Sequence, residues 1–167
     1  MTTRIPVTIV NHVSIEISRP ADLVWAAILA DYVEARKFSA VGYTVEALNE
    51  PAAFLGGYHL RFLQDSSVLD ERLCRITELV PSSRRLSMGA DYLSVPGGMT
   101  VHASYQAQAD GANARFAIDC FSTLGIDPPG DESQAAVAEA VATMSAQYET
   151  ALLGYLQSFK AALEAQA

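Results

Sequence analysis

The residues best suited to chemistry lie in one predicted strand hairpin, on either side of Asp65-Ser66-Ser67. If those three residues form the loop, Gln64 pairs with Val68. The same register places Arg61 directly opposite Glu71, and opposite charges in such cross-strand positions attract each other. A carboxylate at this place could act as a general base, and a guanidinium could stabilise an enolate or orient a polar ligand group.

The pattern of the first strand leaves the orientation of this pair open. Periodicity alone turns three of its side chains inward, namely Tyr58, Leu60 and Phe62. His59 and Arg61 then lie in solvent, where an ion pair contributes little to stability. The opposite orientation puts the pair on an inner face shared with Leu63 and Leu73. A buried pair costs desolvation energy and persists mainly where it meets a ligand or further hydrogen bonds.

Seven strand segments must position these residues. They are Pro6–Ser18, Tyr43–Leu48, Gly57–Gln64, Val68–Val80, Arg84–Leu93, Met99–Ala109 and Ala114–Thr123. Short turn-rich links join the later segments, which is typical of antiparallel neighbours. After the first strand, one short helix is expected up to about Ala30 and a second from Tyr32 to Phe38.

The last third of the chain predicts one long amphipathic helix, from about Ser133 to Ala165, capped by Asp131 or Ser133. Its apolar residues recur at helical spacing: Val137, Val141, Met144, Tyr148, Leu152, Tyr155, Phe159 and Leu163. At about 1.5 Å per residue the helix is roughly 50 Å long. It therefore has to lie along a sheet, and a sheet curved around one helix tends to leave a cavity.

Composition excludes several classes of function. The net charge of −8 and the pI of about 4.7 argue against nucleic acid and against anionic membranes as partners. No segment has the roughly 18 apolar residues of a membrane span, and none resembles a signal peptide, so we expect a cytoplasmic protein. Cys74 and Cys120 are expected to be reduced core thiols. No metal site, nucleotide-binding loop or other cofactor motif is legible.

Several motifs, in order along nearly the whole chain, resemble the SRPBCC superfamily. They are ISRPADLVWAAI, GGYHLRF followed by DERLCRITEL, then RRLSM and a terminal YLQSFK. The resemblance is closest to bacterial polyketide cyclase/dehydratase-like proteins and plant abscisic-acid receptors. It implies a single START-like domain over residues 1–167 with the α+β helix-grip fold. That fold is a curved seven-stranded antiparallel sheet around a long C-terminal helix, with two short helices between strands 1 and 2.

The resemblance also implies an orientation for the hairpin. In the relatives, a Gly-x-x-Arg strand and a Glu-Arg-Leu strand place Arg and Glu side chains in the ligand cavity, which here correspond to Arg61 and Glu71. Asp119, in FAIDCF, stands where related receptors carry an acidic cavity residue. We therefore expect Arg61 and Glu71 to face inward. Met99 departs from the family pattern, because a polar aromatic residue is often found at this place.

The first functional hypothesis is a cavity that binds a hydrophobic, partly polar small molecule, such as a lipid, polyketide or aromatic metabolite. The expected apolar walls are Leu63, Leu73, Met88, Ala90, Tyr92, Phe121, Met144 and Leu152. The expected polar contacts are Arg61, Glu71, Asp119 and Tyr155, with Tyr148 beside them on the inner stripe of the long helix.

Two alternatives stay open. A cofactor-free cyclase or dehydratase could use Glu71 or Asp119 as general base and Arg61 or His59 to stabilise an enolate. A protein-interaction module, such as a homodimer, could instead bury Tyr58, Leu60 and Phe62 if these face outward. The sequence leaves both monomer and homodimer open.

Overall fold

The computed structural model describes residues 4–49, 55–129 and 133–165 of the chain. Its strands are β1 (Ile5–Ile17), β2 (Thr44–Ala47), β3 (Gly57–Gln64), β4 (Ser67–Val80), β5 (Arg85–Tyr92), β6 (Met99–Asp110) and β7 (Asn113–Ile126). Its helices are α1 (Ala21–Tyr32), α2 (Arg36–Ala40) and α3 (Gln134–Glu164), with a short 3₁₀ helix, η2, at Pro81–Ser83. The predicted elements are all present, in the predicted order.

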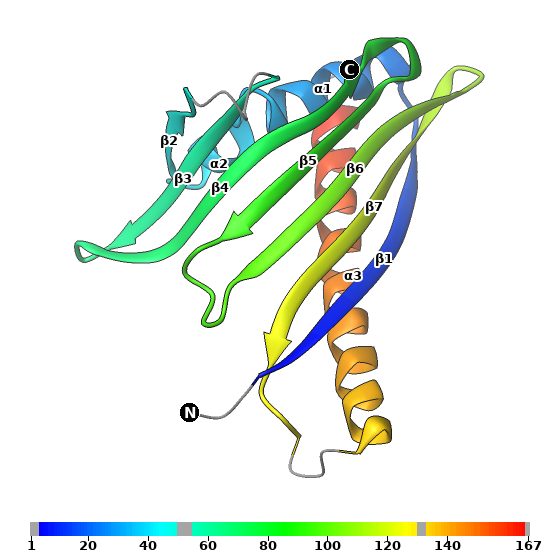
Figure 1. Cartoon of the computed structure of the whole chain (residues 1–167). Coiled ribbons are helices and arrows are strands. Elements are labelled where there is room, and N and C mark those ends of the chain that lie inside the picture. The colour runs from blue at the N-terminus through cyan, green and yellow to red at the C-terminus, as the bar shows by residue number, and fades with distance from the viewer. Residues whose placement is uncertain (1–3, 50–54, 130–132, 166–167) are drawn as a thin grey trace.

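The seven strands form one curved antiparallel sheet in the order β1-β7-β6-β5-β4-β3-β2 (Figure 1). Strands β2 to β7 are a meander, because each pairs with its neighbour in sequence. β1 joins the far side by pairing along its whole length with β7. The predicted α+β fold class, a helix-grip sheet around a long terminal helix, is therefore confirmed.

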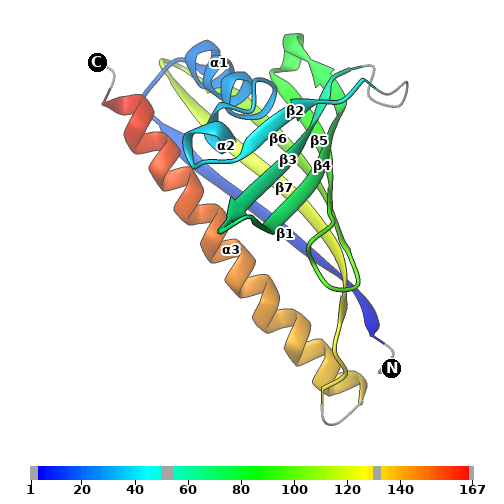
Figure 2. The ribbon, with the colours of Figure 1, turned by 90° about the vertical axis from the view of Figure 1, so that its left-hand side faces the viewer.

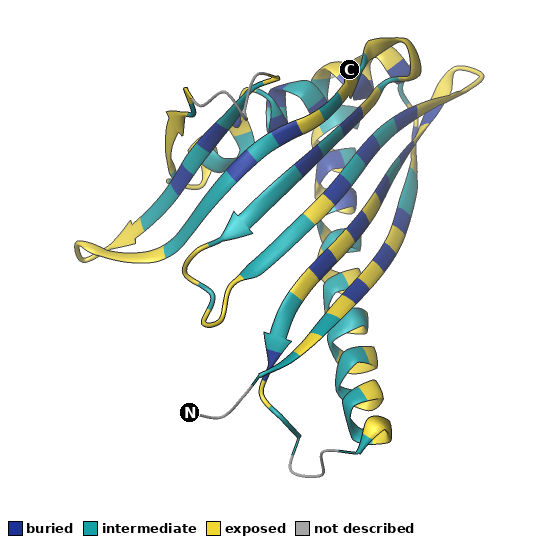
Figure 3. Cartoon of the chain, viewed as in Figure 1, coloured by how far each residue is buried: buried dark blue, intermediate teal, exposed yellow. Residues whose placement is uncertain are grey.

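Alternating burial identifies the two faces of the sheet (Figure 3). Along β7, Phe116 and Ile118 are buried, whereas their neighbours Arg115 and Ala117 are more exposed. We call the face that carries these buried residues the inner face. Because side chains of a strand alternate with period two, the parity of a residue decides which face it joins.

The long helix α3 lies along this inner face (Figure 2). Its N-cap is Ser133, whose hydroxyl accepts a hydrogen bond from the Ala136 amide, while the alternative cap Asp131 lies outside the described residues. The Asn11 amide of β1 donates to the Ser145 carbonyl of α3 at 3.0 Å, and Leu156 is fully buried. These contacts fix α3 against β1.

The two short helices differ from their predicted limits. α1 continues to Tyr32, and α2 begins only at Arg36, after Ala35 adopts a left-handed backbone conformation with φ of 56°. Ala35 is itself buried, and the chain changes direction at this residue. The change of direction brings α2 beside β2, with the Phe38 ring 6.0 Å from the Tyr58 ring of β3.

The β3–β4 hairpin has the predicted register through a different turn. The predicted three-residue loop is wrong, because Gln64 pairs with Ser67 and leaves only Asp65 and Ser66 in the turn. Both turn residues have positive φ, the combination that suits the twist of a two-residue hairpin. A β-bulge after Phe62 then shifts the ladder, so Arg61 pairs with Glu71 as predicted.

Candidate functional site

A cavity of about 440 Å³ lies between the inner face of the sheet, helices α1 and α2, and the middle of α3. Most of its wall is apolar, with Met88, Ala90 and Val101 from the sheet and Leu152 from α3. This volume falls within the range of small-molecule pockets, which are mainly apolar with a few polar groups.

Six of the seven tyrosines of the chain line this cavity: Tyr32, Tyr58, Tyr92, Tyr105, Tyr148 and Tyr155. The rings of Tyr32 and Tyr105 are 3.9 Å apart. The Tyr58 hydroxyl donates to the Tyr32 carbonyl oxygen at 2.7 Å, and the Tyr155 hydroxyl donates to Asp31 at 3.2 Å. Burial raises the pKa of Tyr58 and of Tyr155, so both hydroxyls stay neutral donors.

One polar cluster in the cavity is built around Arg72 of β4. Its guanidinium donates to both carboxylate oxygens of Asp70 and, at 3.1 Å, to the Tyr43 hydroxyl. The same guanidinium lies 4.4 Å from the ring centre of Tyr92. Burial opposes ionisation of Asp70, but the hydrogen bonds from Arg72 and Tyr43 outweigh it and hold the pKa of Asp70 below its ordinary value. Arg72 therefore lines the cavity with its positive charge neutralised by the Asp70 carboxylate.

The second cationic group, Lys37 of α2, has no such partner. Its Nζ lies 3.7 Å from the ring centre of Tyr32 and 4.4 Å from that of Tyr155. Among the described residues, no ion pair or hydrogen bond joins this amine to an acceptor. Burial lowers the pKa of Lys37 to about 7, opposed by the Asp31 carboxylate and assisted by the Arg72 charge.

The two cysteines are free and buried, as expected, and both line the cavity. Burial raises the pKa of the Cys74 thiol to about 11 and also raises that of Cys120. A thiol of raised pKa is almost wholly protonated near neutral pH, so both cysteines contribute neutral, apolar surface to the cavity wall.

Six of the predicted site residues do lie in the cavity wall. They are Met88, Ala90, Tyr92, Tyr148, Leu152 and Tyr155. The hydroxyl of Tyr148 is 3.8 Å from the Met99 sulfur, so the methionine that departs from the family pattern also faces the cavity. Met144, one turn before Tyr148 on α3, is half-buried and does not line it.

Seven others lie outside the cavity wall: His59, Arg61, Leu63, Glu71, Leu73, Asp119 and Phe121. In the sheet, Leu60 pairs with Arg72, and both of these belong to the inner face. Arg61 follows Leu60 and Glu71 precedes Arg72, each by one residue, so both side chains point to the opposite face of the sheet. The inward orientation implied by the family resemblance is therefore wrong, whereas the apolar alternation of Tyr58, Leu60 and Phe62 predicts the observed face.

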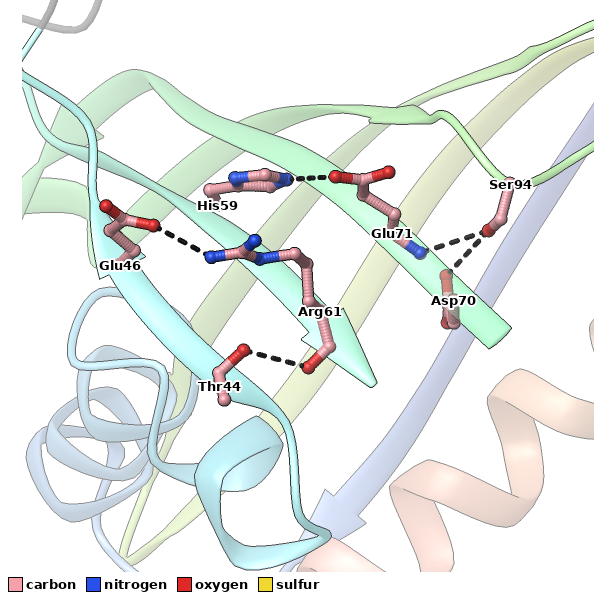
Figure 4. A network of polar contacts seen from close by, with 7 residues as sticks. All are labelled: Thr44, Glu46, His59, Arg61, Asp70, Glu71 and Ser94. Atoms are coloured by element: carbon pink, nitrogen blue, oxygen red, sulfur yellow. Dashed lines mark hydrogen bonds and ion pairs between the residues drawn. The ribbon is translucent and has the colours of Figure 1, made fainter. Parts of the chain in front are cut away.

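On this outer face the charged residues satisfy one another (Figure 4). His59 Nε2 is 2.8 Å from Glu71 Oε1, and Arg61 donates to Glu46 of β2 at 3.2 Å. The directly opposed Arg61 and Glu71 thus bind different partners. These polar side chains therefore contact one another on the outer face and do not reach the cavity.

Asp119 and Phe121 lie on the same outer face of β7. His12 Nδ1 is 2.6 Å from Asp119 Oδ1, and the rings of His12 and Phe121 meet edge to face at 6.1 Å. Phe121 is 44% exposed. Its pairing partner in β6 is His102, which is exposed as well, so the register of β6 with β7 puts both residues on the outer face.

Sequence reasoning missed the two cationic groups of the cavity. Arg72 could have been found from the sequence. The register that pairs Arg61 with Glu71 also pairs Leu60 with Arg72, and paired residues lie on the same face of a sheet. If Leu60 faces inward, Arg72 does too. Lys37 carries no comparable signal, since a lysine in a short helix is ordinarily solvated. Only the fold around Ala35 brings it over the tyrosine rings.

Two searches of the described residues bear on other kinds of site. In residues 4–49, 55–129 and 133–165, no group of three or more His, Cys, Asp or Glu side chains is arranged to hold a metal ion. Within these same ranges, no helix is both long and apolar enough to cross a membrane.

Comparison with known proteins shows likeness in structure rather than in sequence. No family model matches the sequence, and no curated protein matches it. The Zhui aromatase/cyclase from Streptomyces sp. R1128 is similar with a TM-score of 0.59 and 19% identity, over 95% of this chain and 94% of that one.

Two further structures extend this likeness. Norcoclaurine synthase from Thalictrum flavum matches with a TM-score of 0.57 and 12% identity, over 83% of this chain and 87% of that one. Ara h 8.0201 matches with a TM-score of 0.56 and 11% identity, over 91% of this chain and 99% of that one. The chain thus has the same helix-grip fold as these three structures.

Proposed function

We propose that the protein binds one hydrophobic, partly polar small molecule in the cavity under α3. The carrying observation is the cavity itself, about 440 Å³ of mostly apolar wall into which a few polar groups converge. The fold-level likeness to an aromatase/cyclase and to norcoclaurine synthase supports a small-molecule cavity in this position.

The chemistry of the wall narrows the ligand class. Tyrosine rings favour flat or aromatic groups, which stack on them, and their hydroxyls favour oxygen atoms at the ligand edge. The cationic end, at Lys37 and Arg72, favours a carbonyl or other electron-rich group there. An aromatic or polyketide-type metabolite meets these conditions better than a plain acyl chain.

The two alternatives receive less support. Glu71 and Asp119 face away from the cavity, so general-base chemistry by either would have no substrate within reach. Tyr58 and Leu60 are buried in the monomer, so they offer no surface for a second copy. Binding is therefore the function that the geometry favours.

The binding proposal is tested with an aromatic fluorescent probe, 1-anilinonaphthalene-8-sulfonate, and with native mass spectrometry of freshly purified protein. The wild type should bind the probe saturably at one site. Ala90→Phe places a large side chain in the cavity and should weaken probe binding at least tenfold. Ala109→Phe makes the same change at an exposed position on the neighbouring strand and should leave binding unchanged.

Near-UV circular dichroism must first show native packing, because loosely packed states also bind this probe. If Ala90→Phe does not fold, Ala151→Phe narrows the cavity from the α3 side instead. Equal probe affinity in the cavity variant and in Ala109→Phe would contradict the proposal.

A further inference from the structure

The chain has only two lysines, Lys37 and Lys160, and their contacts differ. Lys160 lies outside the cavity, donates to the Glu16 carbonyl oxygen at 2.8 Å and pairs with Glu164 at 3.8 Å. Lys37 lines the cavity and contacts ring faces instead of acceptors. The contrast provides a matched internal control for the reactivity of Lys37.

The groups that face Lys37 come from every element packed around it. Asp31 and Tyr32 belong to α1, Arg72 and Cys74 to β4, and Tyr155 to α3. Only Asp31 carries negative charge, and its carboxylate already accepts the Tyr155 hydroxyl. Ring faces and this carboxylate favour the ammonium form, whereas burial and the Arg72 charge favour the free amine.

Burial is the largest of these effects, and it lowers the pKa of Lys37 to about 7. A lysine of ordinary pKa, about 10.4, is almost wholly protonated at neutral pH. At neutral pH, by contrast, a large fraction of the protein molecules carry Lys37 as the neutral amine. A free amine in an apolar pocket is the form that attacks carbonyl carbon, as in enzymes that form Schiff bases.

We propose that Lys37 captures an apolar or aromatic aldehyde or ketone in this cavity as a covalent imine. The Nζ lone pair forms the new C–N bond while the C=O π electrons move to oxygen. Nitrogen then loses one proton and oxygen gains one, which gives the carbinolamine. Protonation of its hydroxyl lets water leave as the nitrogen lone pair forms C=N, and the iminium gives up the second nitrogen proton to become the imine. Amine and carbonyl become imine and water, with no oxidant or reductant needed.

The surrounding residues suit this reaction. The tyrosine rings beside Nζ can stack on an aromatic aldehyde and exclude bulk water, which favours loss of water from the carbinolamine. Asp31, whose carboxylate accepts the Tyr155 hydroxyl, is the carboxylate whose charge acts on Lys37 and favours its cationic forms. The inference rests on the proposed function, since it assigns a ligand class and a covalent step to the same cavity.

The test is reductive trapping with 2-naphthaldehyde and sodium cyanoborohydride at pH 7, followed by peptide mass spectrometry. Adducts at Lys37, at Lys160 and at the α-amino group are quantified separately in the wild-type protein. Lys37 should be labelled at least tenfold faster than Lys160. Its rate should level off above about pH 8, whereas an ordinary lysine continues to gain reactivity up to about pH 10.

Three variants sharpen the test. Lys37→Arg should abolish only the Lys37 adduct, and Lys160→Arg should leave Lys37 labelling unchanged. Ala151→Phe should slow labelling at Lys37 and not at Lys160, because it narrows the cavity without touching the amine. Labelling of Lys37 no faster than that of Lys160 would overturn the inference. If the fluorescent probe still binds in that case, only the imine fails, and the binding function stands.

Discussion

At the scale of single residues, the hairpin contains two arginines in opposite situations. Arg61 is 43% exposed by its side chain and donates to Glu46, which is more exposed still. The Arg72 side chain is only 20% exposed and is enclosed by Asp70, Tyr43 and the Tyr92 ring. A half-buried carboxylate depends on its partner far more than an exposed one does, because water cannot replace that partner as well.

Arg72→Met should therefore lower the free energy of unfolding by about 2 kcal/mol, the usual cost of removing a hydrogen-bonded charge partner. Arg61→Met, the matched change on the outer face, should cost less than about 0.5 kcal/mol. Urea unfolding followed by circular dichroism measures both. Equal costs for the two variants would show that the Arg72 cluster is no better than a surface pair.

The same cluster has a pH signature. Its hydrogen bonds hold the pKa of Asp70 below the unfolded value, so the folded state gains stability wherever unfolded Asp70 would still bind a proton. This gain is complete above about pH 4 and is lost as pH falls through the folded pKa. The stability difference between wild type and Arg72→Met should accordingly shrink in acid.

At the scale of elements, the packing of α3 decides where the cavity lies. The Phe159 ring packs on Phe116 of β7 at 4.9 Å, and Leu156 is completely buried. Tyr148 and Leu152, one to two turns earlier, line the cavity instead. The C-terminal part of α3 therefore holds the helix to the sheet, while its middle serves as the cavity wall.

Leu156→Ala should destabilise the protein by about 3 kcal/mol, since it removes buried methyl groups and leaves a void at the helix anchor. Leu69→Ala, at a position that is 53% exposed in β4, is the control and should cost less than about 1 kcal/mol. Thermal and urea unfolding monitored at 222 nm, a wavelength sensitive to helix, distinguish the two. A small loss for Leu156→Ala would mean that α3 is fixed mainly by its Asn11 contact.

At the scale of the whole molecule, the free energy of unfolding should depend on pH through Lys37, which is half-buried in the cavity wall. The folded pKa of Lys37, about 7, lies below that of a lysine in the unfolded chain, about 10.4. Between these values the unfolded state binds more protons, so stability rises with pH. Below about pH 7 both states are protonated, and the full cost of burying the charge is present.

Lys37→Met removes this dependence while keeping a long apolar side chain. The variant should be more stable than wild type at pH 6, and its advantage should narrow by on the order of 1 kcal/mol per pH unit between pH 7 and 9. Lys160→Met serves as control, with a difference from wild type that stays constant over that range. A constant difference for Lys37→Met as well would show that its amine is as well solvated as an ordinary lysine.

The sequence by itself determined the fold, for identifiable reasons. Period-two alternation marks strands, and a long apolar stripe at helical spacing requires a sheet to pack on. The apolar parity of Tyr58, Leu60 and Phe62 also indicated the inner face of the hairpin, although the family resemblance pointed the other way. Six wall residues, among them Tyr92, Leu152 and Tyr155, followed from the same two periodicities.

Only the tertiary structure decided which polar groups meet in the cavity. Strand register settles which neighbour of a pair faces inward, so Arg72 rather than Arg61 occupies the wall. A single left-handed residue, Ala35, sets where α2 lies and thereby brings Lys37 over the rings of Tyr32 and Tyr155. Local patterns carry no information about such contacts, because residues remote in sequence become neighbours only when the sheet curves and the helices close over it.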